Sequence, residues 1–144
     1  MNRVQKIAWL IVITISLSVV LSAVAAGILY AKFGLPKMTE GLAFLCIAGT
    51  GGLGPLIFKK DKGHVTCDER DRIINHKAAL AGFGAAYLIV GLSCMLPFLI
   101  LGPNSSISVN WLPMIFTGVA LSSFFMHSVA ILIQYGREVK GEKS

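Results

Sequence analysis

Four long apolar runs, separated by polar segments, restrict the folds that are open to this chain. They cover residues 7–30, 41–58, 78–101 and 111–135. The first run has 24 residues without a charged side chain; as an α-helix it would measure roughly 36 Å, enough to cross a ~30 Å hydrocarbon core with some tilt. Charged residues make up 14% of the chain, against about 25% in soluble proteins. The sequence therefore predicts an all-α polytopic membrane protein, one domain (1–144) built as a bundle of four transmembrane helices.

The start of the first run is also similar to a signal peptide. Arg3 and Lys6 precede it, and Ala23-Val24-Ala25 is similar to a cleavage site. The apolar stretch is longer than the ~7–15 residues of a typical signal-peptide core. We therefore expect a retained span, with cleavage as the alternative.

The second run is the shortest, with 18 residues, and is rich in glycine between positions 48 and 55. Pro55 has no N–H to donate to the carbonyl of Gly51, so an α-helix is weak there. Two interpretations stay open. The glycines form a smooth packing face for a neighbouring helix, or the helix is broken and its free carbonyls line a polar site. We favour the packing face, because glycine and proline are common in membrane helices.

Small residues recur at four-residue intervals in two of the runs. This spacing places them on one face of a helix, where they allow a second helix to approach closely. The first run has such a stripe at Ser18, Ser22 and Ala26, and the third has one at Ala78, Gly82 and Ala86.

The polar loop 59–77 contains a motif that predicts a helix outside the membrane. Thr66 followed three residues later by Glu69 fits a capping box, and Arg72 has acidic residues three and four positions before it. No helix breaker separates the motif from the third run, so we expect the third helix to extend into the cytoplasm. The candidate contact motif on this extension is Asp68, Glu69, Arg70, Asp71 and Arg72.

Basic residues indicate how the spans are oriented. Of 13 Lys and Arg residues, 11 lie in the N-terminal segment, the middle loop and the C-terminal tail, and only Lys32 and Lys37 lie in the other two loops. Because cytoplasmic loops carry the excess of Lys and Arg, we expect a multi-pass protein of the cell (inner or cytoplasmic) membrane with both termini in the cytoplasm.

His127 is the one ionisable side chain well inside a predicted span, which makes it a candidate for function. Several small or polar residues fall at a similar depth when they are counted from the midpoints of the spans. They form either a small polar cavity or a hydrogen-bonded packing layer. We expect packing, because no carboxylate joins the layer to make a proton relay. The candidate layer is Thr14, Gly51, Gly52, Gly54, Tyr87, Ser123 and His127.

The sequence gives no indication of an enzyme, a cofactor or a metal site. The hydrolase, metalloprotease and phosphate-loop motifs are absent from it. Cys67 and His76, nine residues apart, would lie on opposite faces of a helix, and no second pair of ligands completes a zinc site with His64. Cys46 and Cys94 are expected to be small buried apolar residues. We therefore predict no catalytic, cofactor-binding or metal-ligating residue.

The run C-D-E-R-D-R-I-I-N-H-K-A, placed just before a membrane helix in a four-span chain, resembles a group of small prokaryotic membrane proteins with a similar motif and no assigned function. The resemblance implies a prokaryotic integral membrane protein and transfers no catalytic residue. Small multidrug transporters also have four spans, but the first span here lacks their intramembrane glutamate.

Two classes of function remain open. One is a non-enzymatic binding or accessory protein, whose cytoplasmic helix contacts a membrane-protein partner or a second copy of the chain. The other is a small oligomeric transporter or channel that uses the layer around His127. The lipid bilayer is the expected environment in both cases, and the position of the basic residues at the ends of apolar runs argues against nucleic acid as a partner.

The topology is directly testable. Reporter domains fused after Lys62 and after Ser144 should give a cytoplasmic signal, and a reporter near Ser105 should give an external one, because of the asymmetry of basic residues. A cytoplasmic signal at Ser105 would contradict the four-span topology.

Overall fold

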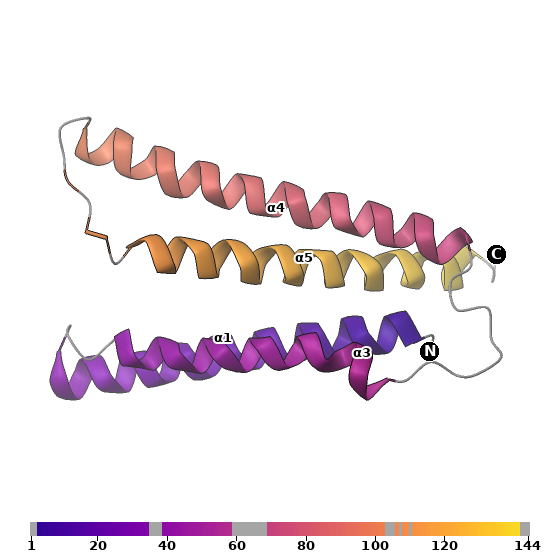
Figure 1. Cartoon of the computed structure of the whole chain (residues 1–144), viewed down its shortest axis with the longest axis horizontal. Coiled ribbons are helices and arrows are strands. Elements are labelled where there is room, and N and C mark those ends of the chain that lie inside the picture. Colours follow the sequence, from indigo (N-terminus) through magenta and orange to yellow (C-terminus); the bar gives the residue numbers. More distant parts are fainter. Residues whose placement is uncertain are drawn as a thin grey trace. The chain divides into compact units, whose positions relative to one another are not determined.

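The computed structural model describes residues 3–34, 39–58, 69–102, 106, 108, 109 and 111–141. In chain order it consists of α1 (Arg3–Phe33), the 3₁₀-helix η1 (Thr39–Leu53), the short α3 (Gly54–Ile57), α4 (Glu69–Leu101) and α5 (Trp111–Gly141) (Figure 1). There is no strand among the described residues.

Four segments are long and apolar enough to cross a membrane, so the all-α, four-span fold class is confirmed. They are Arg3–Phe33, Glu40–Ile57, Glu69–Leu101 and Trp111–Gly136. The chain divides into two compact units, one containing α1, η1 and α3 and the other containing α4 and α5 as far as Arg137. Each unit is a pair of helical segments and is described by itself.

In the first unit, the small residues of α1 form its buried stripe. Ser18 is fully buried, and Ser22 and Ala26 are 4% and 6% exposed. The Ser22 hydroxyl donates a hydrogen bond to the carbonyl of Gly41 on η1 over 3.1 Å. A Cβ added to Gly41 would lie only 2.6 Å from the backbone nitrogen of Ala26. The predicted stripe is therefore confirmed, and it allows the backbones of α1 and η1 to come into direct contact.

The 3₁₀ geometry of η1 explains how the shortest apolar run spans. A 3₁₀-helix rises about 2.0 Å per residue, against about 1.5 Å in an α-helix. The 15 residues of η1 therefore extend roughly 30 Å. Sequence spacing gave no indication of this, because 3₁₀ runs longer than a few residues are uncommon.

The contacts with α1 require this rise. Gly41 lies against Ala26, and Gly54 lies against Ile7, where an added Cβ would be 3.0 Å from Cγ2. Ile7 and Ala26 are about 28 Å apart along an α-helix. Gly41 and Gly54 are about 26 Å apart at the 3₁₀ rise, but only about 20 Å apart in an α-helix. Only the 3₁₀ geometry brings both glycines into register with α1.

Burial along η1 and the start of α3 follows the three-residue period of a 3₁₀-helix. Residues at this spacing are buried or half-buried, while most residues between them are exposed. These buried and half-buried positions form one line along the helix, with leucines at its start and small residues at its end. The line consists of Leu42, Leu45, Ala48, Gly51 and Gly54.

The glycine-rich segment 48–55 therefore forms a packing face, as favoured from the sequence. Gly51 and Gly54 are buried, and a Cβ on Gly51 would lie 2.7 Å from the hydroxyl oxygen of Thr14. Gly49 and Gly52 have nothing within 4 Å of an added Cβ. The helix also changes type here, because Pro55 lies in the first turn of α3, where a missing N–H costs no hydrogen bond.

Arg3 ties the start of α1 to the end of α3. Its Nε donates to the carbonyl of Phe58 over 2.5 Å, and its Nη2 donates to the carbonyl of Pro55 over 3.1 Å. The last carbonyls of a helix lack partners within the helix and carry partial negative charge. A guanidinium therefore satisfies and stabilises this end of the span.

Glycine ends both α1 and α4. Gly34 has φ 78° and Gly102 has φ 81°, the left-handed region that favours glycine. Their N–H groups donate to the carbonyls of Tyr30 and Phe98, each over 3.0 Å. This is the single-bond C-terminal cap of an α-helix.

In the second unit, α4 and α5 run antiparallel and side by side (Figure 1). Ile74, Ala78 and Gly82 are the buried residues of α4. A Cβ on Gly82 would lie 2.9 Å from the carbonyl oxygen of Ser123 on α5. Two members of the predicted small-residue stripe are thus buried, and Ala86, the third, is half-buried.

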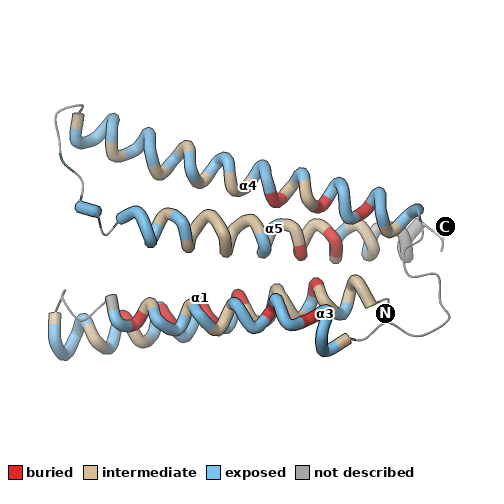
Figure 2. Tube along the Cα trace, in the orientation of Figure 1, coloured by how far each residue is buried: buried red, intermediate tan, exposed pale blue. Residues whose placement is uncertain are grey.

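Most of the large apolar side chains point outward, as expected for helices in lipid. Figure 2 shows burial confined to parts of each helix. Phe83 on α4 and Phe116 on α5 are 74% and 76% exposed, whereas Ser18 and Ser128 are fully buried. Cys46 and Cys94 are also exposed, so the prediction that they are buried is wrong: the narrow contact stripes run along other positions of these helices, which leaves the thiols on outer faces.

A pair of glycine variants tests the contact between α1 and η1. Gly41→Ala should lower the free energy of unfolding by about 1–3 kcal/mol, the usual cost of overpacking, because its Cβ would meet backbone atoms of Ala26. Gly49→Ala is the matched control in the same helix and should change it by less than about 0.5 kcal/mol. Unfolding of the full chain with increasing SDS in mixed micelles measures both. Equal effects would contradict this packing.

Candidate functional site

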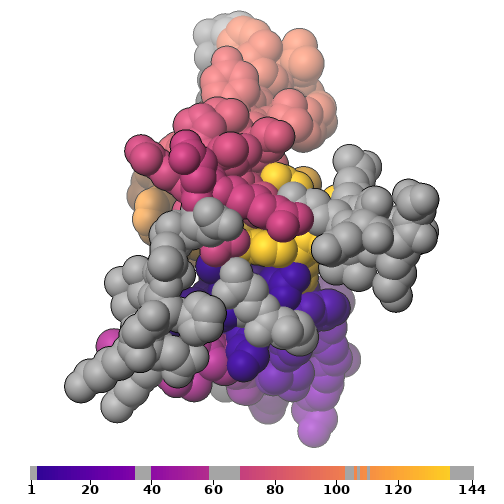
Figure 3. Space-filling view, turned by 90° about the vertical axis from the view of Figure 1, so that its right-hand side faces the viewer, coloured from indigo at the N-terminus to yellow at the C-terminus, as the bar shows by residue number. Residues whose placement is uncertain are grey.

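The first turns of α4 are the most polar exposed part of the described chain. Glu69, Arg70, Arg72, Asn75, His76 and Lys77 are all exposed, and this end of the helix lies at the surface in Figure 3. The helix continues from Glu69 into the apolar run without a break, as predicted. The motif is therefore held on the same rigid element that crosses the membrane.

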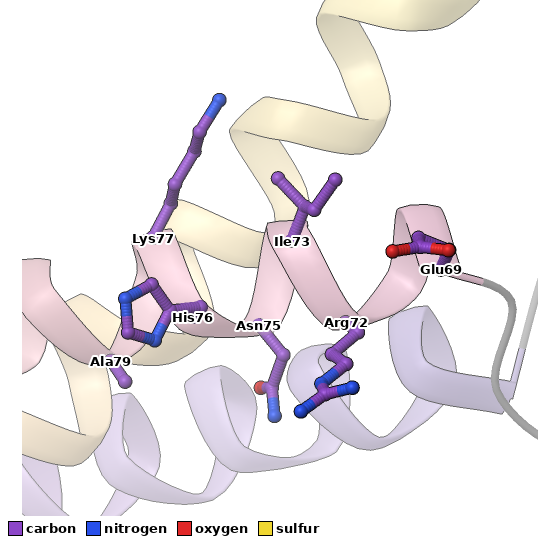
Figure 4. Close-up of a pocket in the computed structure, with 7 residues that line it drawn as sticks. All are labelled: Glu69, Arg72, Ile73, Asn75, His76, Lys77 and Ala79. Carbon is purple, nitrogen blue, oxygen red and sulfur yellow. The ribbon is translucent and has the colours of Figure 1, made fainter.

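The first turns of α4 have three faces, because each residue is rotated by about 100° from the one before it around the helix axis. Asp71, Ile74 and Ala78 form the half-buried to buried face. A second face is centred on Ile73 and includes Glu69, Arg70 and Lys77. A third face carries Arg72, Asn75, His76 and Ala79. In Figure 4, Ile73 and Lys77 point to one side of the helix and Arg72 and Asn75 point to the other.

Asp71 faces inward and is bound by α5. The Tyr135 hydroxyl donates a hydrogen bond to its Oδ1, and both residues are half-buried. Hydrogen bonds to an ionised acceptor are stronger than neutral ones. Of the predicted contact motif, Asp71 therefore fixes α4 to α5 and is not available for a partner, whereas Glu69, Arg70 and Arg72 are exposed.

Part of the predicted motif lies outside the described residues. This applies to the proposed cap Thr66, to Asp68, and to His64 and Cys67. The predicted ion pair between Glu69 and Arg72 does not form in the structure, and Arg72 makes no hydrogen bond or ion pair with any described residue. Exposed pairs of this kind gain little in water, so both side chains extend into solvent.

An open hollow lies against the exposed side of the first turns of α4. Its volume is about 590 Å³. Arg72 and Asn75 lie next to each other along the third face, and the His76 ring is nearby (Figure 4). The lining residues are Glu69, Arg72, Ile73, Asn75, His76, Lys77 and Ala79.

The predicted polar layer is divided between the two units. On α5, Ser123 and His127 meet α4 at Gly82, where an added Cβ would lie 3.3 Å from Cβ of His127. The other atoms at this contact are the carbonyl oxygen and the hydroxyl oxygen of Ser123. The His127 ring has no hydrogen bond to any described residue, so the expectation of hydrogen-bonded packing is not met at this side chain.

Tyr87 does not belong to this contact. It is 81% exposed. Five residues separate it from Gly82, which turns it about 140° away from the face that meets α5. Depth along the membrane placed it beside His127, but helical rotation separates the two.

In the other unit, the Thr14 hydroxyl donates to backbone carbonyls of its own helix, α1. Its hydroxyl lies 2.9 Å from the carbonyl of Leu10 and 3.0 Å from that of Ile11, the usual satisfaction of Ser and Thr inside helices. Gly51 packs directly on it, whereas Gly52 is exposed. Thr14 and Gly51 therefore make a close packing contact between helices, and Gly52 takes no part in it.

Two interactions were missed from the sequence, namely the Asp71–Tyr135 hydrogen bond and the contacts of Arg3 with the end of α3. Both join residues more than 50 positions apart. Asp71 carries one signal, because it lies three residues before Ile74 and seven before Ala78, on the face of the small-residue stripe. Ser128 was also missed: it is fully buried, and its hydroxyl has no hydrogen-bond partner within the described part of the chain.

No group of three or more His, Cys, Asp or Glu residues that could hold a metal ion occurs among the described residues. The comparisons add no relative: no family model, no curated protein and no solved structure matches the chain.

The Asp71–Tyr135 bond can be measured directly. Tyr135→Phe should lower the free energy of unfolding by about 1–2 kcal/mol, because it removes a hydroxyl that donates a hydrogen bond to a half-buried carboxylate. Tyr87→Phe is the matched control and should have little effect, since that hydroxyl is exposed. A double-mutant cycle with Asp71→Asn should show coupling between positions 71 and 135. Independent effects would contradict a direct bond.

Proposed function

We propose that the protein is a non-enzymatic accessory protein of the cell membrane, with both termini in the cytoplasm, that presents the start of α4 to a membrane-protein partner. The proposal is supported chiefly by the exposure of Ile73, an apolar residue that is 51% exposed on a helical extension rich in charged residues. The excess of basic residues at this end of the spans supports the cytoplasmic orientation.

The contact face combines an apolar centre with charged flanks. Arg70 and Lys77 lie three residues before and four residues after Ile73, and Glu69 lies four before it, so all four share one side of the helix. Interfaces commonly bury an apolar anchor and surround it with polar residues. Charged side chains of both signs surround Ile73, so the complementary partner surface is an apolar pocket with a charged, polar rim.

The rigidity of α4 supports this role. Asp71 is bonded to Tyr135, and Ile74 and Ala78 are 3% and 0% exposed. The face opposite the contact is therefore fixed against α5. A preorganised helix loses less entropy when it binds than a segment that must first fold.

The alternative, a small oligomeric transporter or channel built around His127, has less support. The contact at Gly82 has no room for a Cβ, and Tyr87 is turned outward. The remaining observation in its favour is the His127 ring, which is half-buried and has no hydrogen bond to a described residue.

Photo-crosslinking in the native membrane tests the proposed contact. A photoreactive amino acid at position 73 should give an adduct of one discrete mass, and the same group at Asn75, on another face, should not. Ile73→Ser in the chain that carries the group at position 77 should reduce that adduct about tenfold, consistent with the loss of a buried apolar anchor. Ile73→Leu is the matched control and should retain it.

Three results would count against this function. One is the absence of adducts at both positions 73 and 77. Another is equal adducts at positions 73 and 75, which would indicate random collision. The last is an adduct with the mass of two copies of the chain, which would assign the face to self-association.

A further inference from the structure

We propose that Arg72, Asn75 and His76 bind the phosphate of an anionic phospholipid in the leaflet where α4 enters the membrane. These residues are three and four positions apart, so they follow one side of the helix. All three are exposed and line the open hollow. Ile73 and Lys77 also line this hollow, but their side chains point to the other side of the helix (Figure 4). The proposal does not require a protein partner.

The three side chains offer hydrogen-bond donors that suit a phosphate. The Arg72 guanidinium is planar and can donate two parallel N–H bonds to one phosphate group. The Asn75 amide and the His76 ring each add a donor. Figure 4 shows Arg72 and Asn75 extending in the same direction. They form a short row of donors with a positive charge at its outer end.

Nearby acidic residues do not neutralise this row within the described structure. Asp71 is turned inward and accepts the hydrogen bond from Tyr135. Glu69 also lines the hollow and lies only about 4.5 Å from Arg72 along the helix axis, but it forms no ion pair with Arg72 in the structure. Arg72 has no ion pair with a described residue. Its charge is therefore available to an external anion.

The depth of the row matches lipid headgroups. The apolar run begins at Ala78, so His76 and Asn75 lie about 3–5 Å outside the hydrocarbon boundary along the axis. The headgroup layer on each side of a bilayer is roughly 5–7 Å thick. Arg72 begins about 9 Å from the boundary, and its long side chain can extend toward the headgroups.

The same face continues into the membrane as an apolar surface. Ala79 lines the hollow. Phe83, seven residues after His76 and therefore on the same side, is 74% exposed. Val90, seven residues further, is 42% exposed. A molecule with its phosphate at Arg72 could thus lay an acyl chain along Phe83 and Val90. This continuity favours a phospholipid over free phosphate.

Native mass spectrometry of the full chain, released from nanodiscs, tests the proposal. The discs contain phosphatidylcholine with a minor fraction of phosphatidylglycerol, and the ratio of the two lipids that remain bound is compared. Arg72→Gln should lower the preference for phosphatidylglycerol about fivefold or more, as expected for losing one basic contact to an anionic lipid. Asn75→Leu, which changes no charge, should lower it as well.

Lys77→Gln is the matched control. It removes one positive charge that begins closer to the hydrocarbon boundary than Arg72 but on the Ile73 face. It should change the preference less than about twofold if the phosphate is bound by specific donors and not by net charge. Excess inorganic phosphate should not displace the retained lipid.

The proposal would be overturned if Arg72→Gln and Lys77→Gln had equal effects, since the attraction would then come from net charge alone. It would also be overturned if Asn75→Leu had no effect, or if inorganic phosphate displaced the lipid. Each of these results leaves the crosslinking at Ile73 unaffected, so failure of this proposal is distinguishable from failure of the proposed partner contact.

Discussion

The close approach of η1 to α1 is the constraint on which the first unit depends. Helices in lipid gain little from burying apolar surface against each other, so packing and hydrogen bonds must hold them. Glycine at position 41 lets the two backbones meet at Ala26, and the Ser22 hydroxyl donates a hydrogen bond to the carbonyl of Gly41. Once this contact is made at one end of the pair, the contact of Gly54 with Ile7 at the other end requires the longer rise of a 3₁₀-helix.

The second unit is also held by a close contact at a glycine and by a hydrogen bond between its two helices. Gly82 allows α5 to approach α4 within the membrane, and Asp71 and Tyr135 join the two helices beyond the apolar run. The start of α4 is thereby held as a rigid helix with two exposed faces. One has an apolar centre at Ile73, which we propose contacts a membrane protein, and the other carries Arg72, Asn75 and His76, which we propose bind a lipid phosphate.

Much of the fold could be predicted from sequence, because span length and small-residue spacing are local properties. The four apolar segments and the stripe Ser18, Ser22 and Ala26 were found in this way. The helix type of η1 was not, since it depends also on register with α1, which the spacing of its own residues does not reveal. The polar layer was predicted from depth alone. Depth does not determine rotation about the helix axis, which explains why Tyr87 faces outward.

The most direct test of this account is a pair of distances in one bilayer sample. Solid-state NMR of the full chain, selectively labelled at alanine, glycine and isoleucine, can detect contacts between Ala26 and Gly41 and between Ile7 and Gly54. The account predicts both contacts together, because a 3₁₀-helix of about 26 Å matches the spacing on α1. Detecting Ala26–Gly41 without Ile7–Gly54 would indicate the shorter rise of an α-helix and would contradict it.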